Sequence, residues 1–186
     1  MVNEADYIAP TRRWVEQAVI GLNLCPFAKR EWVKDRVRIV VTHDTEEWAL
    51  LATLHAELDF LEANPAVETT LIVHPDLLTD FFDYNQFLGD ADALLSGLDL
   101  EGIYQIASFH PDYQFGGTDP DDAENYTNRS PFPMLHLLRE ASLEGAIARY
   151  PDVDSIPDNN MNLMNDKGAD YMRALLAGCF KDDEIA

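Results

Sequence analysis

Residues 102–140 read GIYQIASFHPDYQFGGTDPDDAENYTNRSPFPMLHLLRE, and the rest of the chain is organised around this stretch. An apolar segment over residues 103–109 leads into a polar connection, and a second apolar segment follows over residues 133–149. We expect a strand, a long loop and a helix, in that order. Buried strands that lead into polar loops commonly form the binding sites of α/β proteins. Candidate functional residues are therefore sought first in this stretch.

Two earlier segments repeat the strand pattern. Residues 37–42 (VRIVVT) and 69–73 (TTLIV) are rich in β-branched residues and almost continuously apolar, as in strands covered on both faces. Between the strands, residues 44–64 and 79–97 carry apolar side chains at helical spacing. Such long helical connections indicate parallel neighbouring strands joined by right-handed crossovers. We therefore predict an α/β fold with a small, largely parallel sheet of about three strands flanked by helices.

Further helices are expected at both ends of the chain. Residues 10–21 and 166–177 show helical spacing, whereas residues 149–162 (RYPDVDSIPDNNMN) do not and are expected to be irregular. A chain of 186 residues with 47% hydrophobic content is long enough for one buried core and short for two. We predict a single α/β domain over the whole chain, with frayed ends at about residues 1–6 and 181–186.

The composition excludes several classes of partner. With 34 acidic and 13 basic side chains, the net charge is −21, which repels nucleic acid and anionic membrane surfaces. No apolar run approaches the roughly 20 residues that span a bilayer, and the first residues lack the pattern of a secretory signal. Two cysteines form no disulfide framework, in keeping with a reducing compartment. We expect a bacterial, cytoplasmic protein that binds neither nucleic acid nor membranes.

Three histidines, His43, His74 and His110, follow the C-terminal ends of the three predicted strands. Parallel strands bring these ends to one edge of the sheet, where ligands bind in open α/β sheets. Each histidine alone is explained as a polar residue that ends a strand, but the set indicates a shared site. We predict that His74 and His110 act as acid/base groups or as ligands of a divalent metal ion. His43 is the weakest member, because it precedes a helix start and can simply face water.

The loop after His110 supplies the remaining candidates. A connection of about 20 residues inside a compact domain is usually functional, and its aromatic residues favour an ordered loop that covers the sheet edge. Tyr113 is a candidate catalytic residue, and together with Asn128 it is expected to orient a substrate. The guanidinium of Arg129 could clamp a carboxylate or phosphate. The alternative for Arg129 is a structural ion pair with one of the acids in residues 119–124.

Three other polar residues have structural explanations. Ser130 is a good N-cap for the helix predicted after it, and His136 lies on the apolar stripe of that helix as a core histidine. Cys25 is expected to follow a helix end, where the negative potential does not stabilise a thiolate. Burial is therefore the first interpretation of Cys25, and a role as metal ligand or nucleophile is the second.

Four segments are long enough to be specific: GLNLCPFA (21–28), TLIVHP (70–75), ASFHPDYQF (107–115) and NYTNRSPFPMLHLLREAS (125–142). Together they resemble the signature segments of an uncharacterised bacterial family, domain-of-unknown-function family 1415, over about residues 10–165. The resemblance carries no activity with it. It implies that the family's motif positions are matched by Asn23, Cys25, Pro26, His74, Pro75, His110, Pro111, Tyr113, Phe115, Asn128, Arg129, Ser130, Pro131, His136, Arg139 and Glu140. His43 and His55 lie outside these segments.

Two hypotheses about function follow. The first is an enzyme that acts on a small anionic metabolite, with His74 and His110 as acid/base groups or metal ligands and Arg129 as the anion clamp. The second is a non-catalytic module that binds a ligand or a partner, in which the motif residues hold one loop in place. The first hypothesis also requires that both histidines and Arg129 face one cavity.

Overall fold

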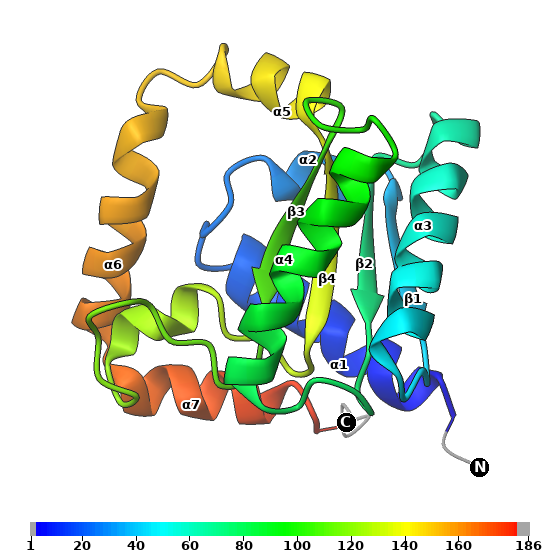
Figure 1. Ribbon diagram of the computed structural model, residues 1–186. Helices are drawn as coiled ribbons and strands as arrows, with labels where there is room; N and C mark the ends of the chain where they lie inside the picture. The colour runs from blue at the N-terminus through cyan, green and yellow to red at the C-terminus, as the bar shows by residue number, and fades with distance from the viewer. Residues whose placement is uncertain (1–2, 182–186) are drawn as a thin grey trace.

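A four-stranded sheet lies at the centre of the computed structural model, which describes residues 3–181 (Figure 1). The strands are β1 (Val37–Val41), β2 (Thr69–Val73), β3 (Tyr104–Phe109) and β4 (Met134–Arg139). Their order across the sheet is β1-β2-β4-β3. β1 and β2 are parallel, whereas β4 is antiparallel to both of its neighbours. The fold is therefore mixed α/β, and the prediction of a largely parallel sheet of about three strands was wrong.

The missing strand is β4, which the sequence analysis placed in a helix over residues 133–149. The structure divides that segment into β4 and the short helix α5 (Glu140–Ile147). Residues 134–139 (MLHLLR) contain no β-branched residue, and leucine and methionine favour a helix. Their position between β2 and β3, where both edges of β4 pair with a neighbouring strand, overrides that local preference.

β1, β2 and β3 still point in the same direction, because β2 and β3 are both antiparallel to β4. Their C-terminal ends therefore share one edge of the sheet. The two long helices α3 (Glu47–Ala63) and α4 (Phe81–Gly97) cover one face. Their leucines and aromatic residues form the largest core with Ile72, Leu135 and Leu137 of the sheet.

The other face of the sheet is covered by helices from both ends of the chain (Figure 1). α1 (Ala5–Trp14) continues directly into the π-helical segment η1 (Val15–Ile20), and α2 (Ala28–Val33) follows after a turn. The first helix thus begins at Ala5 rather than at residue 10, so residues 5 and 6 of the expected frayed end are helical. Residues 1, 2 and 182–186 of the expected frayed ends lie outside the described part of the chain.

The long connection after β3 does not remain a loop on the sheet edge. It contains the short 3-10 helix η2 (Ala123–Thr127), which packs against α6 (Ile156–Lys167) and α7 (Ala169–Gly178). A second short 3-10 helix, η3 (Val153–Ser155), precedes α6. The expectation of an irregular segment over residues 149–162 was therefore wrong for its second half.

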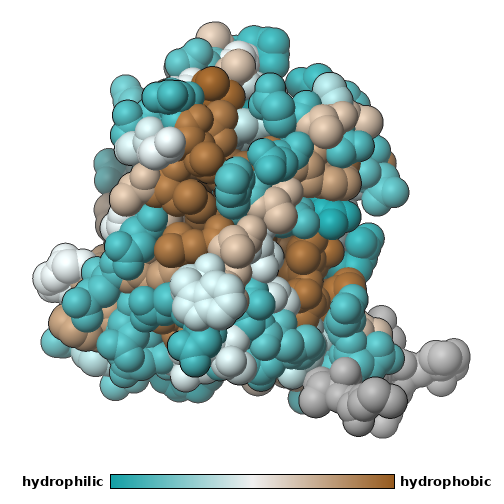
Figure 2. Space-filling view, turned by 45° about the vertical axis from the view of Figure 1, so that its right-hand side comes forward, coloured by the Kyte–Doolittle hydropathy of each residue, from teal (hydrophilic) through white to brown (hydrophobic). Residues whose placement is uncertain are grey.

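The surface on the α3 side is mainly hydrophilic, with hydrophobic residues gathered in strips between the polar side chains (Figure 2). Two large hydrophobic residues near the starts of α3 and α4 are largely exposed, Trp48 at 72% and Phe82 at 70%. Within residues 3–181, none of the helices has the length and apolar character needed to cross a membrane.

Candidate functional site

The two strand-end histidines lie at the edge of the sheet where β1, β2 and β3 end. His74 and His110 are both fully buried. Their rings pack against Tyr84 of α4, with ring centroids 5.9 Å and 5.1 Å from the tyrosine ring. The Tyr84 hydroxyl donates a hydrogen bond to Met134 O at 2.8 Å and accepts one from the Phe109 N–H at 3.1 Å. The two histidines thus share one aromatic neighbour, which is itself fixed to the sheet.

Both rings bind the connection between β2 and α4. His74 Nδ1–H donates to Leu77 O at 3.0 Å, and His110 Nε2–H donates to Leu78 O at 3.1 Å. His110 Nδ1 also accepts the N–H of Asp112 at 3.0 Å, so both nitrogens of this ring are engaged. His74 Nε2 is buried and has no hydrogen-bond partner among residues 3–181. The pair holds two consecutive carbonyl groups in place, and only His74 keeps a free nitrogen.

Burial favours the neutral form of both imidazoles. It lowers the pKa of His74 to about 4 and also lowers the pKa of His110. His43 lies on the surface at the same edge, with Nδ1 2.5 Å from Asp76 Oδ2. In the described part of the chain, no three His, Cys, Asp or Glu side chains are grouped so that they could hold a metal ion. A metal site at this edge therefore stays a prediction that rests on one free nitrogen of His74.

Two other residues predicted for the site, Tyr113 and Asn128, hold the connection after β3 in place. Tyr113 packs between Phe81 and Phe115, with ring centroids 5.0 Å from each. Asn128 Nδ2 donates to Ser108 O at 3.1 Å, and its carbonyl accepts the His110 N–H at 3.2 Å. These contacts fasten the loop to the end of β3.

Arg129 also binds backbone rather than an acid. It donates to Tyr113 O at 3.1 Å and to Pro120 O at 2.7 Å, and its guanidinium carbon lies 4.6 Å from the centre of the Tyr126 ring. No ion pair within residues 3–181 includes Arg129, so the predicted pairing with the acids of residues 119–124 was wrong. Arg129 lines an open hollow beside α7 whose lining includes neither His74 nor His110.

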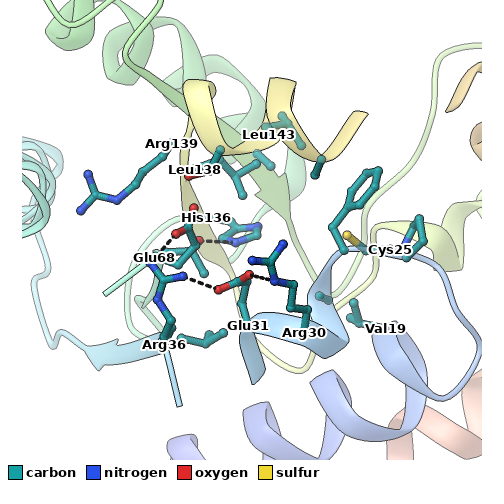
Figure 3. A pocket seen from close by; sticks show the side chains of 18 of the residues that line it. Val19, Cys25, Arg30, Glu31, Arg36, Glu68, His136, Leu138, Arg139 and Leu143 are labelled. Carbon is teal, nitrogen blue, oxygen red and sulfur yellow. Dashed lines mark hydrogen bonds and ion pairs between the residues drawn. The ribbon is translucent and has the colours of Figure 1, made fainter. Parts of the chain in front are cut away.

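A larger pocket, of ≈ 640 Å³, lies on the sheet face opposite α3 and α4 (Figure 3). The sheet forms its floor, and its walls come from η1, the turn over residues 25–27, α2 and α5. A row of paired residues crosses the floor from β2 to β3: Leu71, His136 and Ala107. His136 is the polar member of this row, and the small side chain of Ala107 beside it leaves space over the floor.

The orientation of His136 is fixed by Thr69. The Thr69 hydroxyl donates to Leu137 O, so it accepts from His136 Nε2–H across the 2.7 Å that separate the two atoms. The free Nδ1 of His136 has no hydrogen-bond partner among the residues that the structure describes. Figure 3 shows the ring reaching into the pocket between the charged residues and Cys25. His136 therefore presents one hydrogen-bond acceptor to an apolar cavity.

Two of the titratable residues that line the pocket, His136 and Cys25, favour their neutral forms. Burial lowers the pKa of His136 to about 4, although the residue as a whole is partly accessible. Burial also raises the pKa of the Cys25 thiol, which the N–H groups of Phe27 and Ala28 oppose only in part. Neither a protonated imidazole nor a thiolate is favoured in this pocket.

A network of charged residues forms the rim on the α2 side. Arg36 donates to Glu31 and to Glu68, with a nitrogen–oxygen distance of 2.8 Å in both pairs. Arg30 lies 3.3 Å from Glu31 and has a side chain that is 60% exposed. The two carboxylates are thus matched by arginines within the rim, as the dashed lines in Figure 3 show.

The walls contain a π-helical segment and an aromatic pair. η1 is π-helical, and the Leu24 N–H donates to Val19 O at 2.9 Å as the chain leaves it. π-helical segments in α-helices are frequent at functional sites, and Val19 lines this pocket. On the other side, Phe27 and Tyr150 form an edge-to-face pair with centroids 5.6 Å apart, which joins the turn before α2 to the end of α5.

Sequence reasoning missed this pocket because it placed His136 in the core of a helix. The signal that could have found it is the short apolar run between Pro133 and Arg139. Runs of this length with a charged residue after them also fit a buried strand. As a strand, the segment directs His136 and Leu138 to one face of the sheet and Leu135 and Leu137 to the other.

Comparison with known proteins gives a family and no function. The model of the family described as "Protein of unknown function (DUF1415)" matches residues 6–174. No match was found among curated proteins or among solved structures.

Proposed function

The chain belongs to the family described as protein of unknown function (DUF1415), and for it we propose a binding function: the pocket over His136 takes a small, largely apolar molecule. The observation that carries the proposal is the free Nδ1 of His136, held toward an apolar cavity by the hydrogen bond between Nε2–H and Thr69. Ligand pockets are commonly apolar concave sites with a few fixed polar groups. The volume of ≈ 640 Å³ lies within the usual range for small-molecule sites, roughly 300–1,000 Å³.

Binding is favoured over acid/base or nucleophilic chemistry by the ionisation of the pocket residues. An imidazole with a pKa of about 4 is a weak base near neutral pH, because an efficient general base has a pKa near the working pH. A thiol whose pKa is raised holds little of the thiolate that would act as a nucleophile. The same neutral imidazole is a good acceptor for a ligand N–H or O–H.

The enzyme hypothesis for His74 and His110 remains the second candidate. The unpartnered, buried Nε2 of His74 favours it, because a buried polar atom without a partner costs stability unless something else binds it. The engaged nitrogens of His110 weigh against it, because this ring can neither coordinate a metal nor move a proton without breaking a hydrogen bond.

The direct test is titration with N-phenyl-1-naphthylamine, a neutral apolar dye that has one N–H donor and fluoresces in apolar surroundings. We expect saturable one-to-one binding to the wild-type protein. Ala107→Leu places a larger side chain beside His136, and we expect it to weaken binding about tenfold, the effect of roughly 1.4 kcal/mol. Ala56→Leu is the matched control, because Ala56 is exposed on α3 at the opposite face. Equal affinity in all three proteins would contradict the proposal.

A further inference from the structure

The charges that line the pocket differ from those of the rest of the chain. Of the 13 basic residues in the sequence, four line the pocket, namely Arg30, Arg36, Arg139 and Arg149. Of the acidic residues within the described range 3–181, only Glu31 and Glu68 do so. A chain with a net charge of −21 thus surrounds this one cavity with an excess of positive side chains. Clefts lined by one sign of charge attract ligands of the opposite sign.

The two carboxylates do not cancel this excess of positive charge, because each already pairs with an arginine of the rim. Arg36 donates to Glu31 and to Glu68 at 2.8 Å, and these carboxylate side chains are only 18% and 14% exposed. Arg30 adds a second cation beside Glu31. The acids therefore serve to fix Arg36 at the rim, and the remaining positive charge of the lining comes from Arg139 and Arg149.

Arg139 and Arg149 differ in the hydrogen bonds and ion pairs that their guanidinium groups make. The Arg139 guanidinium donates to Leu61 O at 2.6 Å and to the Tyr104 hydroxyl at 3.0 Å, and Figure 3 shows it directed away from the pocket. Arg149 is exposed, and no hydrogen bond or ion pair engages its guanidinium among residues 3–181. Its Nη2 lies against α5 at Gly145, 3.8 Å from where a Cβ would be. Among the described residues that line the pocket, Arg149 is therefore the cation without a partner.

We propose that the ligand of this pocket is an apolar molecule with one anionic head, and that Arg149 binds the head while the apolar body lies over the sheet near His136. This inference rests on the proposed binding function. An arginine pairs with carboxylate and phosphate through two parallel N–H donors, so the shared chemistry is an anion on an apolar body. The apolar floor of Leu71, Ala107 and Leu138 takes the body.

Four ligands with the same ring system test the inference by displacing N-phenyl-1-naphthylamine. They are 2-naphthoate, 2-naphthyl phosphate, 2-naphthalenemethanol and 2-naphthylmethylamine. We expect at least one of the two anions to displace the dye at about tenfold lower concentration than the alcohol, because a charge-assisted hydrogen bond to arginine is stronger than a neutral one. The anion that performs better distinguishes a carboxylate head from a phosphate head. We expect the cation to be the weakest of the four.

Arg149→Gln should remove the preference for the anion and leave displacement by the alcohol unchanged. Arg173→Gln is the matched control, since Arg173 is an exposed arginine on α7 outside this pocket. An alcohol that competes as well as both anions, or a preference that survives Arg149→Gln, would overturn the inference while dye binding still supports the pocket. Absence of dye binding to the wild-type protein, or dye binding that Ala107→Leu does not alter, would instead overturn the binding function on which it rests.

Discussion

The Nε2 atom of His136 lies 2.7 Å from the hydroxyl oxygen of Thr69, and this hydrogen bond turns the free Nδ1 of the imidazole toward the pocket. The two residues come from neighbouring antiparallel strands, and the hydroxyl is fixed in turn by Leu137 O. A strand that local sequence preferences would make a helix therefore supplies the polar centre of the pocket.

Thr69→Val should destabilise the protein. The change keeps the shape of the side chain but leaves the N–H of His136 without an acceptor, which costs about 1–3 kcal/mol. The free energy of unfolding in urea measures the effect. Thr70→Val is the matched control, because the Thr70 hydroxyl is buried next in sequence and has no partner among residues 3–181. We expect Thr70→Val to leave stability unchanged or to raise it, and equal losses in the two variants would contradict the assigned role of Thr69.

Stability should fall as the pH drops from 7 toward 4. The pKa of His74 is about 4 in the folded protein against about 6.5 when unfolded. Below pH 6.5 the unfolded chain therefore binds a proton that the folded protein does not bind, and this favours unfolding. The contribution of His74 to the free energy of unfolding is complete above pH 6.5. About 2 kcal/mol of this contribution should be lost by pH 5.

The contribution of His74 is isolated by comparing urea unfolding at pH 7 and pH 5 in the wild type and in His74→Gln. The variant should be less stable at pH 7 and should lose less stability between the two pH values. His55→Gln, on the half-exposed side of α3, provides the control and should keep the pH dependence of the wild type. A pH dependence that is the same in His74→Gln and the wild type would count against the neutral buried imidazole.

Tyr84→Phe should weaken the connection between α4 and the sheet. The hydroxyl of Tyr84 links the buried Met134 O and the N–H of Phe109, and its loss leaves each of these groups short of a partner at a cost of about 1–3 kcal/mol. Tyr171→Phe is the control, because Tyr171 is 47% exposed on α7. Thermal unfolding of the two variants would show the difference, and similar melting temperatures would argue against the link.

Metal analysis of untagged protein tests the strand-edge hypothesis. Because both nitrogens of His110 are hydrogen-bonded, we expect any bound divalent metal to be unaffected by His110→Ala. A stoichiometric metal ion that is lost in both His74→Ala and His110→Ala would instead establish the predicted site at this edge, and it would favour the enzyme hypothesis.

The parts of the fold that could be predicted are those in which the local residue preference matches the secondary structure that the segment adopts in the fold. β1, β2 and β3 contain β-branched or aromatic residues and lie close to the predicted segments, and α3 and α4 follow from apolar residues at helical spacing. β4 could not be read in this way, because Met134 to Leu138 prefer a helix locally and become a strand only between β2 and β3. The antiparallel direction of β4 is set by these tertiary contacts, which the sequence pattern does not contain.

The candidate site was predictable to a smaller degree, for the same reason. Sequence pattern correctly placed His74 and His110 at one edge of the sheet, but it could not show that carbonyl groups of the next connection already bind both rings. It singled out Cys25 and His136 without a shared location. The two residues line one pocket only because β4 faces the turn before α2, and that arrangement depends on the strand that was missed.

The most direct measurement is the ¹⁵N NMR shift of the His136 imidazole with and without a bound ligand. At neutral pH the free protein should show a protonated Nε2 and an unprotonated Nδ1 with no hydrogen bond. Saturation with N-phenyl-1-naphthylamine should move the Nδ1 resonance toward that of a hydrogen-bonded nitrogen and leave His74 unchanged. A protonated Nδ1 in the free protein, or a ligand-induced shift at His74 in place of His136, would contradict the assignment of the pocket as the functional site.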